Sequence, residues 1–371
     1  MQVIAKEVIL FGQIFGGLPL KYKNDSSGGK EITFSFTVCV WGWVVIVLQT
    51  CLSQITLYID YHGRQYGDPI RMTSYTAIFA VMLDVISLNI MALVVFMMSF
   101  RHYKKFIEIC YLLGKVDLYF GQKCESGEKP KVFAIVAYMI SLCVTNVVQE
   151  SFLESEGRNT FVYYIPVLTL YFVAASLFIQ FTTVTQNIVT RFRLVNESIK
   201  KAVVNKSFGQ LLKNHDLANI VAIQDDTSCV TKLRELMDLY WLLCDAVKHA
   251  NVFYGNQLLA AVFSAFVHII ITLYYLFLHL RPGQASFLVM QGVWAITHVS
   301  HLVLLVRPST DVTDAANETA PMICRLLNRD LSKNIRKQIA SSVTTYLVIL
   351  IQFQSNPASV TLFDRVNRIT Q

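Results

Sequence analysis

Charged residues are scarce in this chain: Asp, Glu, Lys and Arg make up 15% of its 371 residues, whereas 54% are hydrophobic. A soluble domain usually carries about 25% charged residues. Walker A, GxGxxG, HExxH and GxSxG motifs are also absent from the sequence, so nucleotide, dinucleotide, zinc-protease and hydrolase chemistry have no signature here. We therefore expect a membrane protein that is not an enzyme and that holds no cofactor and no metal ion.

Two further absences narrow the class of protein. The eight cysteines form no CxxC pair and no metal-ligand spacing, so we interpret them as reduced structural residues. The net charge of +7 comes from basic residues in the loops between apolar runs. These residues build no interleaved basic and aromatic surface, which argues against nucleic acid as a partner.

Long apolar runs dominate what remains. A helix needs about 20 apolar residues to cross a bilayer, because every backbone polar group in lipid must be bonded within the helix. A seventh run is shorter than the other six: Ile339 to Phe353 would reach only about 22 Å at 1.5 Å per residue, so we expect a short span there. The other six runs have the full length, and the spans predicted from them are Ile32 to Ile59, Tyr75 to Phe100, Val132 to Phe152, Phe161 to Val189, Leu258 to Leu280 and Phe287 to Val306.

The loops between these runs differ in charge. Seven crossings divide them into two sets, and the set that contains the amino terminus holds 26 of the 32 Lys and Arg residues. Basic loops are retained in the cytosol, so we expect a cytosolic amino terminus and an extracellular carboxyl terminus. The predicted fold is all-α, a polytopic plasma-membrane protein with seven transmembrane helices. The predicted sections are 1–31 (cytosolic amino terminus), 32–190 (helices one to four), 191–251 (cytosolic helical extension), 252–306 (helices five and six), 307–338 (cytosolic segment), 339–355 (short helix seven) and 356–371 (extracellular tail).

The long cytosolic stretch combines apolar and charged residues at helical spacing. This pattern predicts that helices four and five extend into the cytosol and pack on something, either within the chain or between subunits. Four Asn-X-Ser/Thr sequons lie on the predicted cytosolic side, and we interpret them as chance matches. The apolar residues of the pattern are Leu233, Leu236, Met237, Tyr240, Leu243 and Cys244, and the sequons begin at Asn24, Asn196, Asn205 and Asn317.

Polar and aromatic residues on the fifth and sixth predicted spans indicate a ligand pocket. Each set recurs at three- and four-residue intervals and so occupies one helical face. Such faces suit a small polar ligand, because rings stack on its apolar faces while amides bond its hydroxyls. The alternative is that these groups are interfacial anchors or helix-joining contacts. The residues are Gln291, Trp294, His298 and His301 on one span and His268, Thr272 and Tyr275 on the other, with Asn146, Tyr164 and Tyr171 in the same outer half.

Asp84 is a special case among these candidates. It is a carboxylate about 14 Å inside the second span, a costly position that indicates either a role in ligand binding or a structural pairing with His268 or His298.

The last apolar run contains a motif. Residues 345–354 read TYLVILIQFQ, which resembles the TYxxxxxQF signature of insect gustatory receptors. The resemblance implies a homotetrameric, ligand-gated, non-selective cation channel opened by a small-molecule tastant. By that resemblance, Gln352 and Phe353 form the pore constriction, and Thr345 and Tyr346 pack the pore helix. Rings of amides and aromatic side chains suit such a gate for hydrated monovalent and divalent cations.

The pair Gln291 and Trp294 resembles the pocket of the fructose-receptor branch, which implies a sugar ligand; a receptor for bitter compounds is the alternative. The sequence also departs from the family pattern, because the usual helical lead-in before Thr345 is shortened and the chain continues beyond the motif. Two other classes compete. A G-protein-coupled receptor would need an external amino terminus, and a secondary transporter would show inverted repeats or broken helices.

Overall fold

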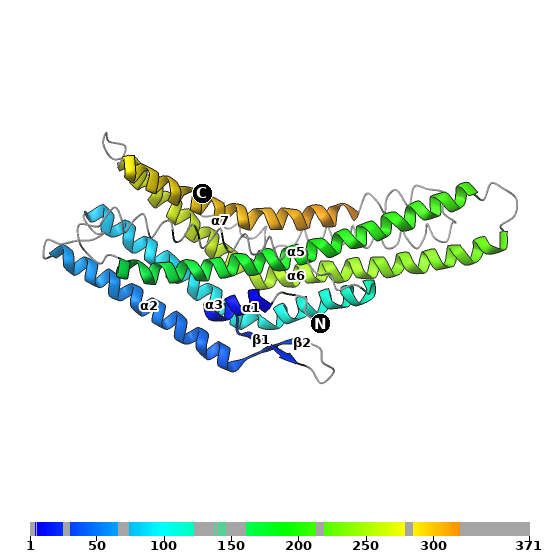
Figure 1. Ribbon diagram of the computed structural model, residues 1–371, viewed down its shortest axis with the longest axis horizontal. Coiled ribbons are helices and arrows are strands. Elements are labelled where there is room, and N and C mark those ends of the chain that lie inside the picture. The colour runs from blue at the N-terminus through cyan, green and yellow to red at the C-terminus, as the bar shows by residue number, and fades with distance from the viewer. Residues whose placement is uncertain are drawn as a thin grey trace, which may run out of the picture. The chain divides into compact units, whose positions relative to one another are not determined.

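The computed structural model describes residues 4, 6–24, 30–65, 74–121, 137, 141, 144, 161–212, 219–278 and 285–319. These residues are mostly helical (Figure 1). The chain forms two compact units, one of residues 1–192 with 239–313 and the other of residues 193–238 with 314–371. The described elements are α1 (Lys6–Ile14), β1 (Leu20–Asn24), β2 (Lys30–Phe34), α2 (Phe36–Gln65), α3 (Tyr75–Phe120), α5 (Phe161–Leu212), α6 (Asn219–Leu278) and α7 (Ala285–Asn317).

Four of the described helices are long and apolar enough to cross a membrane: residues 36–63, 75–120, 165–201 and 231–277. They correspond to the predicted first, second, fourth and fifth spans. The helix α7 covers the predicted sixth span. The predicted third span is described only at residues 137, 141 and 144, which are helical, and the predicted seventh span lies outside the described residues.

Side-chain contacts give the relative directions of these helices. Phe181 of α5 lies 5.4 Å from Tyr254 of α6, measured between ring centroids, and Phe192 lies 5.5 Å from Tyr240. Later residues of α5 therefore meet earlier residues of α6, so the two helices are antiparallel and run alongside each other (Figure 1). Seven successive crossings require this arrangement for the fourth and fifth spans.

The helices α5 and α7 run in the same direction. Tyr171 lies 5.5 Å from Trp294, and seven residues later along both helices, about two helical turns, Phe178 lies 5.1 Å from His301. The fourth and sixth spans of an alternating bundle are parallel, so this contact order also agrees with the predicted succession of crossings.

The helix α5 is the most deeply enclosed of the four apolar helices. Its apolar window is 83% buried, against 28% for α2, 39% for α3 and 33% for α6. Large exposed apolar side chains are concentrated on these other helices, for example Trp41 and Leu48 of α2 and Phe263 and Ile270 of α6. In a membrane protein such side chains face lipid. The core of the bundle is therefore built around α5.

The start of the first predicted span is wrong. The predicted span begins at Ile32, but Lys30–Phe34 form strand β2, and α2 starts at Phe36. The strand pairs antiparallel with β1, with Leu20 opposite Phe34 and Tyr22 opposite Ile32. Alternating apolar and polar residues suit a strand with one buried face, and Leu20 and Ile32 are both buried.

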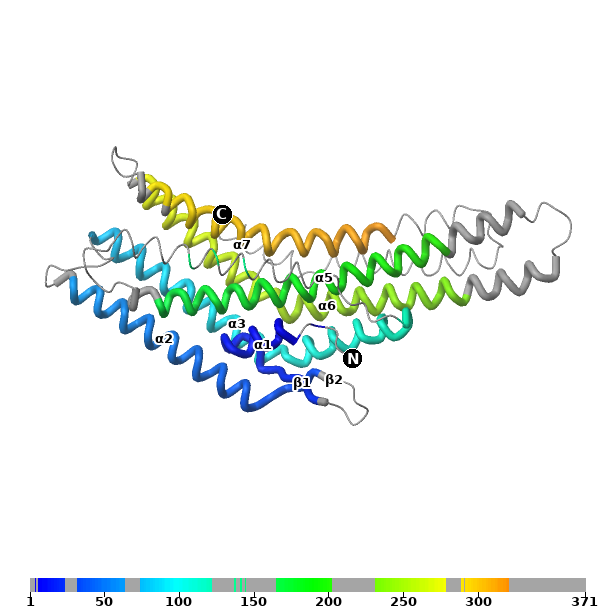
Figure 2. The backbone as a smooth tube through the Cα atoms, viewed as in Figure 1, coloured from blue at the N-terminus to red at the C-terminus, as the bar shows by residue number. Residues whose placement is uncertain are grey.

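The residues before α2 pack against the bundle. Phe15 stacks on Phe172 of α5 with ring centroids 5.1 Å apart, and Gly12 lies so close to α5 that an added methyl group would be 2.5 Å from Nε2 of Gln180. The Tyr22 hydroxyl donates a hydrogen bond to the Ile4 carbonyl at 2.5 Å, and burial raises the pKa of Tyr22. Phe34 of β2 lies 4.7 Å from Tyr103 of α3, measured between ring centroids, and Figure 2 shows the strand pair next to α3. This segment is therefore an integral part of the fold rather than a free tail.

The helices α5 and α6 continue through the residues assigned to the cytosolic extensions, since α5 ends at Leu212 and α6 begins at Asn219. Leu236, Tyr240 and Leu243 of the apolar pattern are buried. The Tyr240 ring contacts Phe192 of the same chain, which favours packing within the chain for this residue. The side of the membrane on which the extensions lie stays a prediction.

Candidate ligand-binding site

Four aromatic rings from three helices meet in the bundle. Tyr171 comes from α5, His268 from α6, and Trp294 and His298 from α7. The Trp294 and His298 rings are stacked, with centroids 5.6 Å apart and planes 15° apart. Tyr171 lies 5.5 Å from Trp294 and 5.8 Å from His268, and the two histidine rings are 4.8 Å apart. We call these four residues the aromatic cluster.

The local sequence explains why these rings meet. Trp294 and His298 are four residues apart, so both lie on one face of α7 and their rings can stack along the helix. The polar faces of the fifth and sixth predicted spans meet inside the bundle, where His268 of α6 contacts His298 of α7. His301 continues the same face and lies 6.0 Å from His298.

Asp84 of α3 lies beside the aromatic cluster. Its Oδ1 is 2.8 Å from Nε2 of His268. This distance is that of an ion pair, and Nε2 makes no hydrogen bond within the described residues. The other ring nitrogen, Nδ1, is 2.5 Å from the Ser264 carbonyl oxygen. Of the two pairings that the sequence left open for Asp84, the structure therefore shows the one with His268.

Depth supports the grouping of these residues. From the predicted spans, Asp84, Tyr171, His268 and His298 each lie about 14 to 18 Å below the outer surface at 1.5 Å per residue. These residues belong to helices that run in opposite directions, yet the structure brings them together. The predicted depths therefore agree with the observed contacts among these residues.

Other predicted pocket residues lie along α6 and α7 toward the predicted outer side. Gln291 and Thr272 are buried, and Tyr275 is partly exposed. Asn146 lies outside the described residues, as do the predicted pore and packing residues Gln352, Phe353, Thr345 and Tyr346. The structure describes the backbone of Tyr164 but not its side chain. Within the described part of the chain, no three His, Cys, Asp or Glu side chains are arranged to hold a metal ion.

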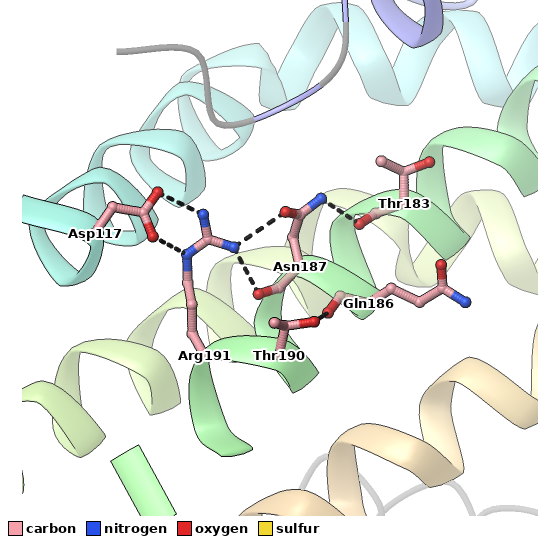
Figure 3. A network of polar contacts seen from close by, with 6 residues as sticks. All are labelled: Asp117, Thr183, Gln186, Asn187, Thr190 and Arg191. Carbon is pink, nitrogen blue, oxygen red and sulfur yellow. Dashed lines mark hydrogen bonds and ion pairs between the residues drawn. The ribbon is translucent and has the colours of Figure 1, made fainter. Parts of the chain in front are cut away.

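A second polar site, which we call the inner network, was not predicted from the sequence. Nε of Arg191 donates to Oδ1 of Asp117 at 2.8 Å, and a terminal nitrogen donates to Oδ2 at 2.6 Å. The other terminal nitrogen donates to the backbone and side-chain oxygens of Asn187, at 2.7 and 3.0 Å. Figure 3 shows the guanidinium group between Asp117 and Asn187. Both charged side chains are almost completely buried.

The sequence contained one signal for the inner network. Asn187 and Arg191 are four residues apart, and the apolar residues Ile188, Phe192 and Val195 surround them. A cation within an apolar helical run requires a buried partner. The predicted fourth span ends at Val189, which places Arg191 among the loop cations instead. The continuation of α5 beyond that residue places Arg191 in the core.

The second compact unit contains a polar contact of its own. Nδ2 of Asn196 donates to the Ala315 carbonyl at 2.8 Å, and the Thr319 hydroxyl donates to Oδ1 of Asn196 at 2.6 Å. Asn196 heads one of the sequons, but its amide is buried and bonded, which agrees with its interpretation as a chance match. At the surface of this unit, Lys200 and Glu318 form an exposed ion pair at 2.9 Å.

Comparison with known proteins identifies the chain's relatives. A family model described as 7tm chemosensory receptor matches residues 8–340. The Gustatory receptor for sugar taste 43a of Drosophila melanogaster is 22% identical over 423 aligned positions, which cover 94% of this chain and 97% of the relative. The Putative gustatory receptor 28b of the same organism is 23% identical over 163 positions, covering 33% of this chain and 34% of the relative. Because 423 positions exceed the 371 residues of this chain, part of the first relative has no counterpart here.

Proposed function

Because this chain belongs to the 7tm chemosensory receptor family and is a multi-pass protein of the plasma membrane, we propose that it is a sugar-gated cation channel. In this proposal a small extracellular sugar such as fructose binds at the aromatic cluster and opens a pore. The protein is then a signalling receptor that leaves its ligand chemically unchanged. The observation that carries the proposal is the convergence of Tyr171, His268, Trp294 and His298 beside Asp84.

The chemistry of the cluster suits a sugar. The indole and phenol rings of Trp294 and Tyr171 offer apolar faces against which the C–H face of a pyranose or furanose ring stacks. The polar groups beside them, from Gln291 and Thr272 on the same helix faces, can exchange hydrogen bonds with sugar hydroxyls. The relative described as a receptor for sugar taste aligns along almost the whole chain, which supports the same ligand class.

The pore belongs to the proposal through the TYxxxxxQF motif. Four copies of the chain would place Gln352 and Phe353 around a central axis, with Thr345 and Tyr346 holding each pore helix against its neighbours. Phenyl rings dewet a constriction, and amides replace part of the hydration shell of a passing cation without strong selection. Monovalent and divalent cations would therefore both pass.

Ligand binding opens the pore only if the open state binds the ligand more tightly than the closed state does. The aromatic cluster provides a means for this difference, because its rings come from α5, α6 and α7. A ligand that bridges the rings favours whichever arrangement of these helices brings them closest to it. A small rearrangement of these helices around the ligand is thus the proposed first step.

The test is to express the chain alone in cells, apply a panel of sugars and bitter compounds, and record membrane current. We expect a sugar to evoke current, and W294L and Q291L to raise the half-maximal sugar concentration by about tenfold or more, which corresponds to about 1.4 kcal/mol of lost binding. V299A is the matched control, because Val299 is on the same helix α7 but its side chain is exposed. A response to bitter compounds alone would replace the sugar with the alternative ligand class.

The same cells test the competing receptor class. An epitope tag at the amino terminus should be stained only after the cells are permeabilised, because the basic loops place this terminus in the cytosol. Staining of intact cells would contradict the topology and favour a G-protein-coupled receptor. If neither sugars nor bitter compounds evoke current, restoring a longer lead-in before Thr345 tests whether the shortened segment prevents conduction.

A further inference from the structure

We propose that Asp84 and His268 form a proton-binding site within the bundle, and that the bound proton is required for sugar binding at the aromatic cluster. The second half of this statement rests on the proposed function, whereas the first half stands without it. The ligand of the site is a single proton, held as an imidazolium ring against a carboxylate.

Nδ1 of His268 carries a hydrogen. This nitrogen lies 2.5 Å from the Ser264 carbonyl oxygen. A carbonyl oxygen only accepts hydrogen bonds, so Nδ1 must carry the hydrogen. In a neutral imidazole the other nitrogen, Nε2, would then have no hydrogen and would present a lone pair.

Nε2 of His268 faces the Asp84 carboxylate. Oδ1 of Asp84 lies 2.8 Å away, and an ionised carboxylate presents only lone pairs. Two lone pairs at this distance repel each other, so a proton must belong to the pair, on either His268 or Asp84. A protonated Asp84 would have to donate along the axis of the Nε2 lone pair. Nε2 has no hydrogen-bond partner among the described residues, whereas an imidazolium and a carboxylate 2.8 Å apart attract each other without a hydrogen bond. The geometry therefore favours the charged pair.

The groups around His268 favour a single bound proton. Every titratable group that faces His268 within the described residues is aromatic or is Asp84: Tyr171 of α5 lies 5.8 Å away and His298 of α7 lies 4.8 Å away, with His301 behind His298. The protonated pair has no net charge. Loss of the proton would leave one uncompensated negative charge deep in the membrane, which is costly, and a second proton on His298 would be repelled by the imidazolium.

The protonated ring of His268 is also part of the proposed ligand site. The His268 ring contacts Tyr171 and His298, and His298 stacks on Trp294. If the proton is lost, Nε2 and Oδ1 must move apart, because their lone pairs then face each other. The His268 ring cannot move without changing its contacts with both neighbours. The arrangement of rings that receives the sugar therefore exists only in the protonated form.

The first test needs no ligand. The full-length chain is labelled with ¹⁵N-histidine and reconstituted in lipid bilayers, and solid-state NMR distinguishes protonated from unprotonated ring nitrogens. The chain has eight histidines, and the signals lost in H268Q identify those of His268. At pH 7 we expect both nitrogens of His268 to be protonated in the wild type, and Nε2 to lose its proton in D84N.

The control for this measurement is H249Q. His249 also pairs with a carboxylate, Glu108 at 3.3 Å, but Glu108 is exposed, so H249Q should leave the His268 signals unchanged. An unprotonated Nε2 of His268 in the wild type at pH 7 would overturn the proposal. If H268Q does not fold, D84E provides a second assignment, because it keeps the carboxylate but displaces it and should shift the His268 signals alone.

The second test addresses the link to sugar binding. Raising the external pH until the His268 proton is lost should increase the half-maximal sugar concentration by about tenfold for each further pH unit, because only the protonated form binds. In D84N this dependence should be absent. Protonated His268 with no sugar-evoked current would contradict the proposed function and leave the proton site intact. Protonated His268 with a pH-independent sugar response would overturn the link.

Discussion

The inner network and the aromatic cluster both place a carboxylate of α3 against a cationic side chain of another helix, but they differ in how completely the polar groups are bonded. In the inner network, three nitrogens of Arg191 donate to oxygens of Asp117 and Asn187. In the cluster, Nε2 of His268 contacts Asp84 as an ion pair without a hydrogen bond. Next to the cluster, Nε2 of His301 has no hydrogen-bond partner within the described part of the chain.

This difference separates a structural site from a receptive one. A buried charge pair whose hydrogen bonds are all made is rigid, because any displacement leaves a buried polar group unpaired. Aromatic faces next to incompletely bonded nitrogens have interactions left to offer. We therefore expect substitutions in the inner network to act on stability, and substitutions in the cluster to act mainly on ligand response. The following experiments test this contrast.

The largest effect is expected for the Asp117 and Arg191 pair. D117L or R191L alone should lower the free energy of unfolding by about 3–5 kcal/mol, because each leaves an uncompensated buried charge. The double variant D117L/R191L should recover most of the loss, since neither charge remains. Thermal unfolding of the detergent-purified receptor, followed by size-exclusion chromatography, measures both. A double variant no more stable than the single ones would show that the pair itself is not the source of the loss.

Asn187 should contribute less to the free energy of unfolding than Asp117 or Arg191 does. N187L removes the oxygen that accepts from Arg191 at 3.0 Å and leaves only the backbone carbonyl at 2.7 Å. A buried donor that loses one acceptor costs about 1–3 kcal/mol, measured by the same unfolding assay. T313V is the matched control. The Thr313 hydroxyl donates to the carbonyl four residues earlier, at 3.1 Å, but this side chain is exposed, so loss of the hydrogen bond should change the free energy of unfolding by less than about 0.5 kcal/mol.

Substitution of His301 is expected to raise stability, whereas substitution of Asn187 lowers it. Its ring packs on Phe178 with centroids 5.1 Å apart, while its Nε2 has no hydrogen-bond partner among the described residues. H301L keeps an apolar contact and removes the unbonded nitrogen, so stability should rise by about 1 kcal/mol while the sugar-evoked current weakens. A loss of stability comparable to that of N187L would contradict the contrast between the two sites.

The smallest effect is expected at the surface of the second unit. Lys200 and Glu318 are about half exposed, so K200A should cost less than about 1 kcal/mol, and the cost should disappear at high salt. N196A in the same unit is the comparison, because its buried amide makes two hydrogen bonds and should cost about 1–3 kcal/mol independently of salt. Equal costs for both variants would show that burial does not decide the outcome.

Several features of the site were predictable because helical spacing is a local property. The three- and four-residue intervals on the fifth and sixth spans placed Trp294 and His298 on one face, and the structure joins that face to His268. The cost of a buried carboxylate predicted that Asp84 would find a partner or a ligand. Spacing alone could not choose between His268 and His298, because the choice depends on how far α3 and α6 are displaced along each other.

Other features required the assembled fold. The strand pair before α2 was missed because an apolar run of helical length absorbed Ile32, although the alternation in residues 30–34 indicated a strand. Arg191 was placed in a loop because the hydropathy of α5 falls after Val189, whereas the helix itself continues to Leu212. Hydropathy reports the solvent around a segment, and a helix that is surrounded by other helices no longer needs apolar residues alone.

The sequence by itself determined that the chain is a helical protein of the membrane, since scarce charge, long apolar runs and the one-sided placement of Lys and Arg are properties of composition and order. It also determined the family through a local motif and through similarity along the chain. Only the tertiary structure decided which polar groups meet: Asp84 with His268, Asp117 with Arg191, and Phe15 with Phe172. Such pairs depend on the rotation and displacement of helices against each other, and these are set by packing between segments far apart in the sequence.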